Sequence, residues 1–349
     1  MSVEFRNVVK RYGAATAVAG VSFVIEAGRL VTLLGPSGCG KTTTLRMIAG
    51  LELPSEGRIL IAGRDVTNLS ATHRDVSMVF QSYALFPHMS VLENVCYGLR
   101  RSGLGKTEAV RRARNGLEQV GLEGFEPRQP SELSGGQQQR VAVARALVLK
   151  PSVLLFDEPL SNLDARLRRQ MREEIRELQQ TLGLTVVYVT HDQQEAMAVS
   201  DRIIVMNAGR IEQQGCPRDL YERPATPFLA RFMGESSPVR GTVRRLSPRH
   251  IRITLGDVDL DVDDSRAVDG EATIAVRPEA ITVETVPTGP GGLAGIIEKS
   301  SYLGTHMEYS IDTSAGLLFA TCPRVDRPLL RGARVTLSLA PHGIVVIGS

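Results

Sequence analysis

Short apolar runs alternate with longer segments of helical period up to about residue 235. The runs that predict strands lie at 3–8, 21–25, 30–34, 76–80, 153–157, 185–190 and 202–206. The segments that predict helices lie at 41–49, 106–120, 136–148, 164–182 and 193–199. This alternation is typical of an α/β domain with a parallel sheet, and polar loops directly follow several of the strands.

The pattern changes after Phe232. A turn-rich junction at 234–238 is followed by short alternating segments such as GTVRRL, HIRITL and HMEYSI, which predict antiparallel strands. We therefore expect two domains, residues 1–235 and residues 236–349, of which the second is a small β barrel or sandwich.

Composition narrows the class of protein. The 41 basic and 38 acidic side chains leave a net charge of +3, far from the strongly basic balance of a protein that neutralises many phosphates, so no nucleic-acid partner is expected. The four cysteines are scattered and form no CxxC pair, which is typical of reduced thiols in a cytosolic protein. The N-terminus lacks the apolar segment of a secretory signal. No run approaches the roughly 20 apolar residues that cross a bilayer, so a membrane role would be peripheral.

A glycine-rich loop lies between the predicted strand at 30–34 and the predicted helix at 41–49. Its sequence, GPSGCGKT from Gly35 to Thr42, fits the pattern GxxxxGK[ST] in the strand–loop–helix context that the pattern requires. Glycines let successive backbone amides converge on phosphate oxygens, and the start of the helix adds a partial positive charge. We expect Lys41 to reach the β- and γ-phosphates of a nucleotide and Thr42 to bind Mg²⁺.

Cys39 lies inside this loop. The helix N-terminus and the Lys41 ammonium predict a lowered pKa and a reactive thiol. No step of nucleotide hydrolysis uses a thiol, so we interpret Cys39 as a small residue that the loop tolerates and that thiol reagents can attack.

Two adjacent carboxylates end the buried-type strand at 153–157. Asp157 is placed to hold the Mg²⁺ shell, and Glu158 is the candidate for polarising the water that attacks the γ-phosphate. An acidic pair alone more often caps the next segment, but a phosphate loop in the same chain favours the catalytic interpretation.

A second anion site is predicted where Leu133-Ser-Gly-Gly-Gln137 opens the helix at 136–148, because Ser134 and the glycines present free backbone amides there. Because it contains this LSGGQ sequence, the chain resembles the ABC ATPase family, for which the sequence is diagnostic. The resemblance covers residues 3–233 and implies a P-loop NTPase with a RecA-like core and a helical subdomain at about 82–150.

The resemblance also implies roles for single residues, each of which alone has an ordinary structural interpretation. The residues implied to bind ATP are Tyr12, Gly35, Ser37, Gly38, Cys39, Gly40, Lys41, Thr42 and Thr43. Those implied to contact the ATP of a partner chain are Ser134, Gly135, Gly136 and Gln137. Catalysis is assigned to Glu158, His191 and Gln81, Mg²⁺ binding to Thr42, Gln81 and Asp157, and the D-loop at the dimer interface to Ser161 and Asp164.

The family implies partners because one chain carries one phosphate loop and one LSGGQ sequence. We expect a homodimer with two composite ATP sites, bound to two transmembrane permease subunits at the cytoplasmic face of the inner membrane and serving an extracytoplasmic solute-binding protein.

The segment at 82–98 is interpreted as an apolar loop. About half of its apolar residues are expected in the core, and the residues implied to form a cleft for the permease are Tyr83, Leu85, Phe86 and Met89.

The second domain resembles the TOBE domain of importer ATPases, an OB-like β domain, most clearly in the sequence VRPEAI at 276–281. This tail favours an importer. The stretches at 76–95 and 184–206 favour ferric iron as the solute, then polyamine, with sugar and phosphonate importers left open. The alternative of another class is a soluble ABC ATPase of DNA repair or translation, although the coiled coil or second cassette of those proteins does not occur here.

Overall fold

The computed structural model describes residues 2–264, 267–285 and 292–347. The chain forms two compact units, Met1–Pro217 and Arg218–Ser349. The sequence placed the domain boundary after residue 235, whereas the compact units divide after Pro217. The reason is packing: helix α8 (Pro227–Gly234), which follows α7 (Pro217–Glu222), contacts strands β11 (Ser237–Arg245) and β14 (Gly270–Val276) of the second unit.

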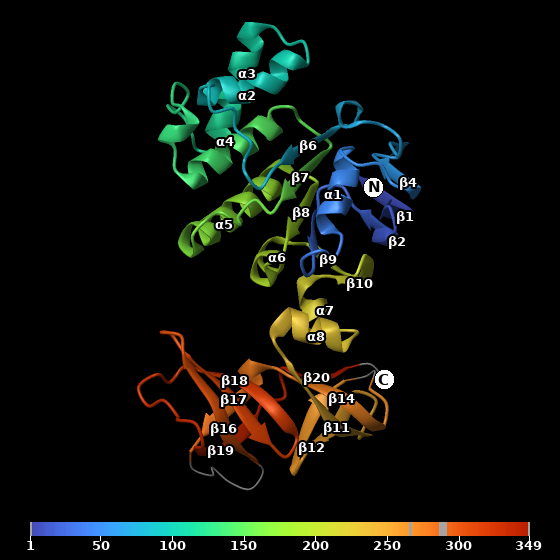
Figure 1. The fold of residues 1–349 in the computed structure, drawn as a ribbon, viewed down its shortest axis with the longest axis vertical. Coiled ribbons are helices and arrows are strands. Elements are labelled where there is room, and N and C mark those ends of the chain that lie inside the picture. Colours follow the sequence, from blue (N-terminus) through green and yellow to red (C-terminus); the bar gives the residue numbers. More distant parts are fainter. Residues whose placement is uncertain (1, 265–266, 286–291, 348–349) are drawn as a thin grey trace. The chain divides into compact units, whose positions relative to one another are not determined.

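A six-stranded sheet forms the centre of the first unit, in the order β10-β9-β3-β8-β7-β6. Strands β3, β8, β7, β6 and β9 are parallel to their neighbours, and β10 pairs antiparallel with β9. Their bounds are β3 Leu30–Leu34, β6 Val76–Val79, β7 Val153–Asp157, β8 Val186–Thr190, β9 Arg202–Asn207 and β10 Arg210–Gly215. Strands β3, β7 and β8 are buried along their whole length, as expected where helices cover both faces (Figure 1).

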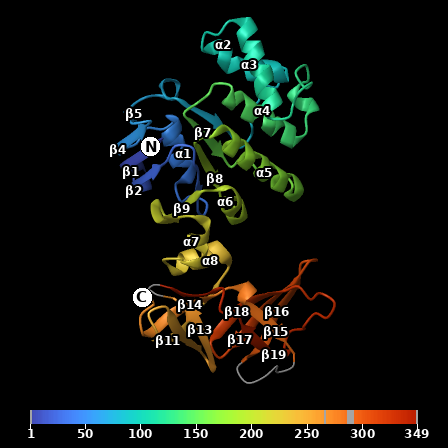
Figure 2. The same ribbon diagram turned by 180° about the vertical axis from the view of Figure 1, so that it is seen from behind.

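The first two predicted strands do not join the parallel sheet. β1 (Val3–Tyr12) and β2 (Ala15–Ile25) form an antiparallel pair, which β4 (Glu56–Ile61) and β5 (Arg64–Asp65) extend in the order β2-β1-β4-β5. Only a tight turn joins β1 to β2, and a connection this short permits a hairpin but not a parallel crossover. Figure 2 shows this sheet beside α1 (Lys41–Ala49).

Three helices form a separate cluster in the first unit: α2 (Val91–Arg101), α3 (Lys106–Gln119) and α4 (Gly135–Leu147) (Figure 1). The sequence interpreted 82–98 as a loop, and this was wrong from residue 91 onward. Ser90 and Glu93 form a reciprocal capping box at the start of α2. This pattern was readable in the sequence, and the apolar residues behind it pack into the cluster.

The remaining helices of the first unit flank the parallel sheet. α5 (Ala165–Leu182) follows β7, and α6 (Gln193–Val199) follows β8 (Figure 2). Aspartates cap both helices: Asp164 accepts from the Leu167 amide, and Asp192 accepts from the Glu195 amide. Both caps lie at the edge of the sheet where the parallel strands end.

The second unit is an all-antiparallel β structure, as the sequence predicted. Its two five-stranded sheets have the orders β13-β12-β11-β14-β20 and β15-β19-β16-β17-β18 (Figure 1). One core contains side chains from both, such as Ile253 and Tyr309. The other strands are β12 His250–Leu255, β13 Val258–Asp263, β15 Ile281–Glu284, β16 Leu293–Tyr302, β17 Met307–Thr313, β18 Gly316–Cys322, β19 Arg334–Leu339 and β20 Ile344–Ile347.

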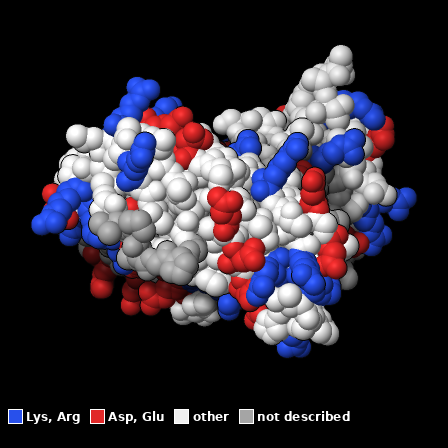
Figure 3. Space-filling model, turned by 90° about the horizontal axis from the view of Figure 1, so that it is seen from below, with Lys and Arg blue, Asp and Glu red and all other residues white. Residues whose placement is uncertain are grey.

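The surface carries mixed charge. Basic and acidic side chains are interspersed over the face drawn in Figure 3. Strands β12 and β13 pair opposite charges, with Arg252 Nε 2.7 Å from Asp261 Oδ1.

Within the described residues, no helix has the length and apolarity that a membrane span requires.

A buried arginine connects α7 to the β structure of the second unit. The Arg277 guanidinium lies 3.6 Å from the centre of the Tyr221 ring and donates to the Tyr221 carbonyl oxygen. The Tyr221 hydroxyl in turn donates to Glu279, and burial together with this bond raises the pKa of Tyr221 to about 12. Arg277 has no exposed surface, so its stem and guanidinium fill space in the core.

We expect Arg277→Ala to lower the free energy of unfolding of the second unit by about 2–4 kcal/mol, because it leaves a cavity and an unpaired carbonyl. Arg240→Ala, at an exposed position of β11, is the matched control and should change it by less than about 0.5 kcal/mol. Pulse proteolysis of the full chain in urea, read on fragments from 218–349, measures both. Equal urea midpoints for the two variants would contradict the packing role.

Candidate functional site

The carboxyl ends of four neighbouring parallel strands meet at one edge of the sheet. Leu34 of β3 lies opposite Thr190 of β8, Asp157 of β7 lies opposite Val189, and β6 ends beside β7. The loops after these strands therefore emerge side by side. They carry the glycine-rich loop, His191, Glu158 and Gln81, so the structure brings together residues that are up to about 150 positions apart in the sequence.

The glycine-rich loop follows a path that only glycine allows. Gly40 has φ +102°, and a Cβ there would lie 2.5 Å from the Ala17 carbonyl oxygen. A Cβ on Gly35 would lie 2.2 Å from the Met206 carbonyl oxygen. The loop therefore needs the absence of side chains at both ends to fit between β2 and β9.

The side chain of Lys41 folds back onto this loop. Its Nζ donates to the carbonyl oxygens of Gly35 at 2.7 Å and Pro36 at 3.0 Å, and the residue is only 5% exposed. Thr42 and Thr43 follow in the half-buried first turn of α1, whereas Ser37 and Gly38 are exposed. A buried ammonium and the N-terminus of α1 thus face the same loop, which is the arrangement that binds phosphate.

Cys39 differs from the sequence prediction. Burial raises the pKa of the Cys39 thiol, and this effect outweighs the opposing effects of the Lys41 ammonium. Cys39 is 3% exposed, and its sulfur packs where a Cβ on Gly35 would lie. The sulfur is therefore a packing group, and desolvation disfavours the thiolate more than the nearby charge favours it.

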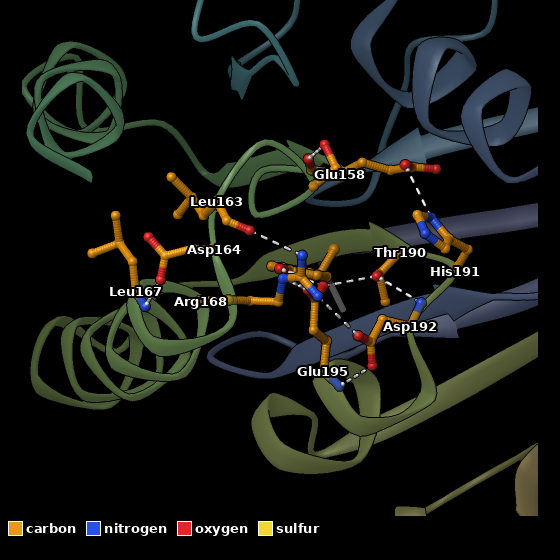
Figure 4. Close-up of polar contacts among 11 residues, drawn as sticks. Glu158, Leu163, Asp164, Leu167, Arg168, Thr190, His191, Asp192 and Glu195 are labelled. Atoms are coloured by element: carbon orange, nitrogen blue, oxygen red, sulfur yellow. Dashed lines mark hydrogen bonds and ion pairs between the residues drawn. The ribbon is translucent and has the colours of Figure 1, made fainter. Parts of the chain in front are cut away.

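Two acidic residues occupy the end of β7. Burial raises the pKa of the Asp157 carboxyl, against the opposing charge of Arg46. Glu158 has φ +45°, a left-handed conformation that is strained for a residue with a side chain. Its backbone amide donates to the Val189 carbonyl oxygen at 3.0 Å, and its Oε2 lies 3.1 Å from His191 Nδ1 (Figure 4).

The loop after β7 is tied to the loop after β6. Ser161 Oγ donates to the Glu158 carbonyl oxygen at 3.0 Å, and Asn162 Nδ2 donates to the Gln81 carbonyl oxygen at 3.0 Å. Gln81 itself is exposed. The sequence did not single out Asn162, since an asparagine in a loop carries no specific signal until its partner is known.

The LSGGQ segment begins α4, as predicted. Ser134 caps the helix by accepting from the Gln137 amide at 3.4 Å, and Gln137 Oε1 accepts from the Ser134 amide at 2.9 Å. A Cβ on Gly135 would lie 3.1 Å from the Leu163 side chain, and one on Gly136 would lie 3.0 Å from Leu167. The two glycines therefore let the start of α4 pack closely on the loop after β7 and on the first turn of α5.

Tyr12 and the segment after Gln81 have different environments. Tyr12 is 47% exposed, and Lys10 Nζ lies 4.8 Å from the centre of its ring. Tyr83 was predicted to line an open cleft, but it is 6% exposed and its side chain packs in the core. The backbone at Tyr83 is left-handed, with φ +60°, and Arg145 Nη2 donates to its carbonyl oxygen at 2.8 Å.

Leu85, Phe86 and Met89, the other residues predicted to meet the permease, are half-buried. Fully buried Asn94 holds this part of the chain, accepting from the Phe86 amide at 2.8 Å and donating to the Phe86 and Met89 carbonyl oxygens at 3.1 Å. The segment is therefore an ordered turn bound to α2.

Comparison with known proteins agrees with this geometry. The family model described as ABC transporter matches residues 18–161, and the TOBE domain model matches residues 274–347. An Fe(3+) ions import ATP-binding protein of Rhizobium meliloti is 58% identical over 346 residues, covering 99% of this chain and 98% of that protein. The protein of the same name from Pasteurella multocida is 49% identical over 346 residues, covering 98% and 97%. The chain belongs to the ABC transporter family.

Solved structures of ABC cassettes resemble the first unit of this ABC transporter family member. A dimeric cassette in a post-hydrolysis state, bound to ADP and phosphate, is 35% identical with a TM-score of 0.55, covering 62% of this chain and 99% of its own. A subunit of an ABC transporter complex of Clostridium perfringens is 30% identical with a TM-score of 0.58, covering 62% and 89%. The chain is an ATP-binding ATPase of this family, and the predicted P-loop fold and C-terminal TOBE domain are confirmed.

Sequence reasoning missed a polar cluster beside His191 in this ABC ATPase. Asp192, which caps α6, and Glu195 of α6 face Arg168 of α5, with ion-pair distances of 3.8 and 3.7 Å (Figure 4). The D-x-x-E spacing of a helix start was the signal that could have found the acidic pair. Arg168 stands in an arginine-rich stretch at 166–176, and nothing in the sequence of that stretch marks it out.

We expect Cys39 to react with iodoacetamide at pH 7.5 at least tenfold more slowly than exposed Cys216, because Cys39 is buried and its raised pKa leaves little thiolate. Peptide mapping by mass spectrometry against time measures both rates in one sample. In urea the two rates should converge. Faster labelling of Cys39 than of Cys216 in the folded protein would instead support the original prediction that Cys39 is reactive.

Proposed function

We propose that this chain is the ATP-hydrolysing subunit of an importer for ferric iron, working as a homodimer on two permease subunits at the cytoplasmic face of the inner membrane. A solute-binding protein outside the membrane would deliver the iron. The observation that carries the proposal is the likeness to Fe(3+) ions import ATP-binding proteins at 57–59% identity over nearly the whole of both chains, the TOBE domain included.

The glycine-rich loop supports the nucleotide part of the proposal. The loop amides and the N-terminus of α1 would hold the phosphates, and Lys41 would exchange its carbonyl partners Gly35 and Pro36 for the β- and γ-phosphate oxygens. Further phosphate contacts are assigned to the loop and first-turn residues Ser37, Gly38, Cys39 (through its backbone), Gly40, Thr42 and Thr43. Exposed Tyr12 would stack on the adenine, since its ring is open to a planar ligand.

The donor set at the sheet edge fits Mg²⁺, which prefers hard oxygen ligands. The Thr42 hydroxyl, the Asp157 carboxylate and the Gln81 amide oxygen would hold it. Bound there, the ion would neutralise part of the phosphate charge. Burial raises the pKa of the Asp157 carboxyl, and a bound dication would remove that electrostatic cost of the charged form.

Hydrolysis is assigned to Glu158, with His191 as its partner. The Glu158 carboxylate would accept a hydrogen bond from the attacking water and orient it in line with the γ-phosphate. His191 Nδ1 lies 3.1 Å from that carboxylate and the side chain is 58% exposed, so His191 could hold Glu158 and contact the γ-phosphate. Gln81 would sense the nucleotide from the neighbouring loop.

The LSGGQ segment would act on the partner chain's nucleotide. The start of α4, with Ser134, Gly135, Gly136 and Gln137, offers backbone amides beside the loop containing Ser161 and Asp164. A two-fold dimer places this surface against a second phosphate loop. The solved cassettes that resemble the first unit are dimeric in their own structures, which supports this arrangement.

The permease contact is assigned to the ordered turn before α2. Leu85, Phe86 and Met89 are half-buried, and the Phe86 ring packs on Tyr97 at 4.7 Å between ring centres. This apolar surface would receive a cytoplasmic helix of the permease. Because the turn begins beside Gln81, movement at the nucleotide would reach the permease through a short stretch of chain.

We expect Glu158→Gln to lower the rate of ATP hydrolysis by at least about a hundredfold while ATP still binds, because the amide orients water poorly and cannot take a proton. An ATP-dependent dimer should accumulate in size-exclusion chromatography. Glu177→Gln, at an exposed position of α5, is the control with unchanged turnover, and Lys41→Ala should lose nucleotide binding. Full turnover in Glu158→Gln would remove Glu158 from the mechanism.

We expect ferric iron to stimulate hydrolysis when the chain is reconstituted in liposomes with its own permease and solute-binding protein. Radioactive iron uptake and phosphate release are measured together, with polyamine, sugar and phosphonate as parallel solutes. Stimulation by another of these solutes would assign a different importer. Hydrolysis that ignores the membrane partners and every solute would instead indicate a soluble ABC ATPase.

A further inference from the structure

Arg168 lies in the first turn of α5, directly after the loop that contains Ser161 and Asp164. Its side chain is 33% exposed, and its guanidinium points toward three groups (Figure 4). Nη2 donates to the Leu163 carbonyl oxygen at 3.0 Å, Nη1 lies 3.8 Å from Asp192 Oδ2, and Nε lies 3.7 Å from Glu195 Oε1. One side chain therefore touches both the D-loop and the helix that follows His191.

Glu195 is the buried end of this connection, with 4% of its surface exposed. Its Oε2 accepts from the Thr190 hydroxyl at 2.8 Å and from the Tyr188 hydroxyl at 3.2 Å. The Thr190 hydroxyl also accepts from the Asp192 amide at 3.0 Å. These bonds enclose His191 on both sides in the sequence, so the position of Glu195 determines the path of the loop that presents His191.

The D-loop is also bound on its other side. Asn162 holds the Gln81 carbonyl oxygen, and Ser161 holds that of Glu158. The ion pairs of Arg168 with Asp192 and Glu195 link the first turn of α5 to α6. A shift of the D-loop therefore reaches the loops of Gln81, Glu158 and His191 together.

We infer that Arg168 is a positioning residue for ATP hydrolysis: through Asp192 and Glu195 it couples the D-loop to the His191 loop and so sets how His191 meets Glu158. The inference rests on the proposed hydrolytic roles of Glu158 and His191. The contacts of Arg168 are with Leu163, Asp192 and Glu195 and not with the glycine-rich loop, so we expect its effect to fall on turnover and not on binding of ATP.

The test compares Arg168→Gln with Arg169→Gln in the full chain. Arg169 is the neighbouring residue, its side chain is 77% exposed, and it pairs with Glu173 instead of α6. We expect Arg168→Gln to lower kcat at least tenfold, with the Kd for a fluorescent ATP analogue changed less than twofold. Arg169→Gln should keep both values within twofold of the unchanged protein.

Two further variants separate coupling from general structural loss. Arg168→Lys keeps the charge, and since distances of 3.7 and 3.8 Å are charge interactions more than hydrogen bonds, it should recover at least a third of the lost kcat. Glu195→Gln should lower kcat, and adding it to Arg168→Gln should lower kcat by less than twofold more, because both changes remove one connection.

The inference is overturned if Arg168→Gln keeps kcat within twofold, if the two changes multiply in the double variant, or if kcat falls only together with ATP affinity and thermal stability. If Arg168→Gln does not fold, the kcat values of Arg168→Lys and Glu195→Gln test the inference instead. A kcat within twofold of the unchanged protein in Glu195→Gln would then overturn it. Failure of the proposed function looks different, because turnover of the unchanged protein would then survive Glu158→Gln.

Discussion

Hydrogen bonding between parallel strands brings the site together. The registers of β3 with β8, β8 with β7 and β7 with β6 place four strand ends at one edge, and the chain leaves each of them as a polar loop. Each loop alone would be a flexible connection. Because they leave neighbouring strands, the four loops emerge side by side at one edge of the sheet and carry there a buried ammonium, two carboxylates, a histidine and an amide.

The loops at this edge are tied to one another as well as to the sheet. Glu158 meets His191 by side chain and Val189 by backbone, Asn162 binds the Gln81 backbone, and the glycines of the LSGGQ segment pack on the loop after β7. These contacts lie within one chain and already connect the surface assigned to a partner with the loops assigned to hydrolysis. The glycines of the LSGGQ segment and single hydrogen bonds between the loops make these contacts, so the loops pack closely although few residues are involved.

Burial decides the cases in which sequence reasoning failed. The neighbouring Lys41 favours the Cys39 thiolate, but burial of the sulfur disfavours the thiolate more strongly. Tyr83 stands in an apolar stretch that could equally face a partner, but its side chain is buried and its backbone is left-handed. Helix α2 was missed although its capping box was readable, because apolar density outweighed the start signal.

The sequence by itself determined the order of the strands and helices around the parallel sheet, the glycine-rich loop, the acidic end of β7 and the cap of α4. These follow from local physics: hydrophobic period, glycine conformations, helix caps and the position of polar residues after buried strands. Only the tertiary structure decided which strands pair, which side chains are buried, that Asn162 and Arg168 connect separate loops, and that α8 packs with the second unit. Those outcomes depend on groups that are distant in the sequence, and no local pattern contains the distance between them.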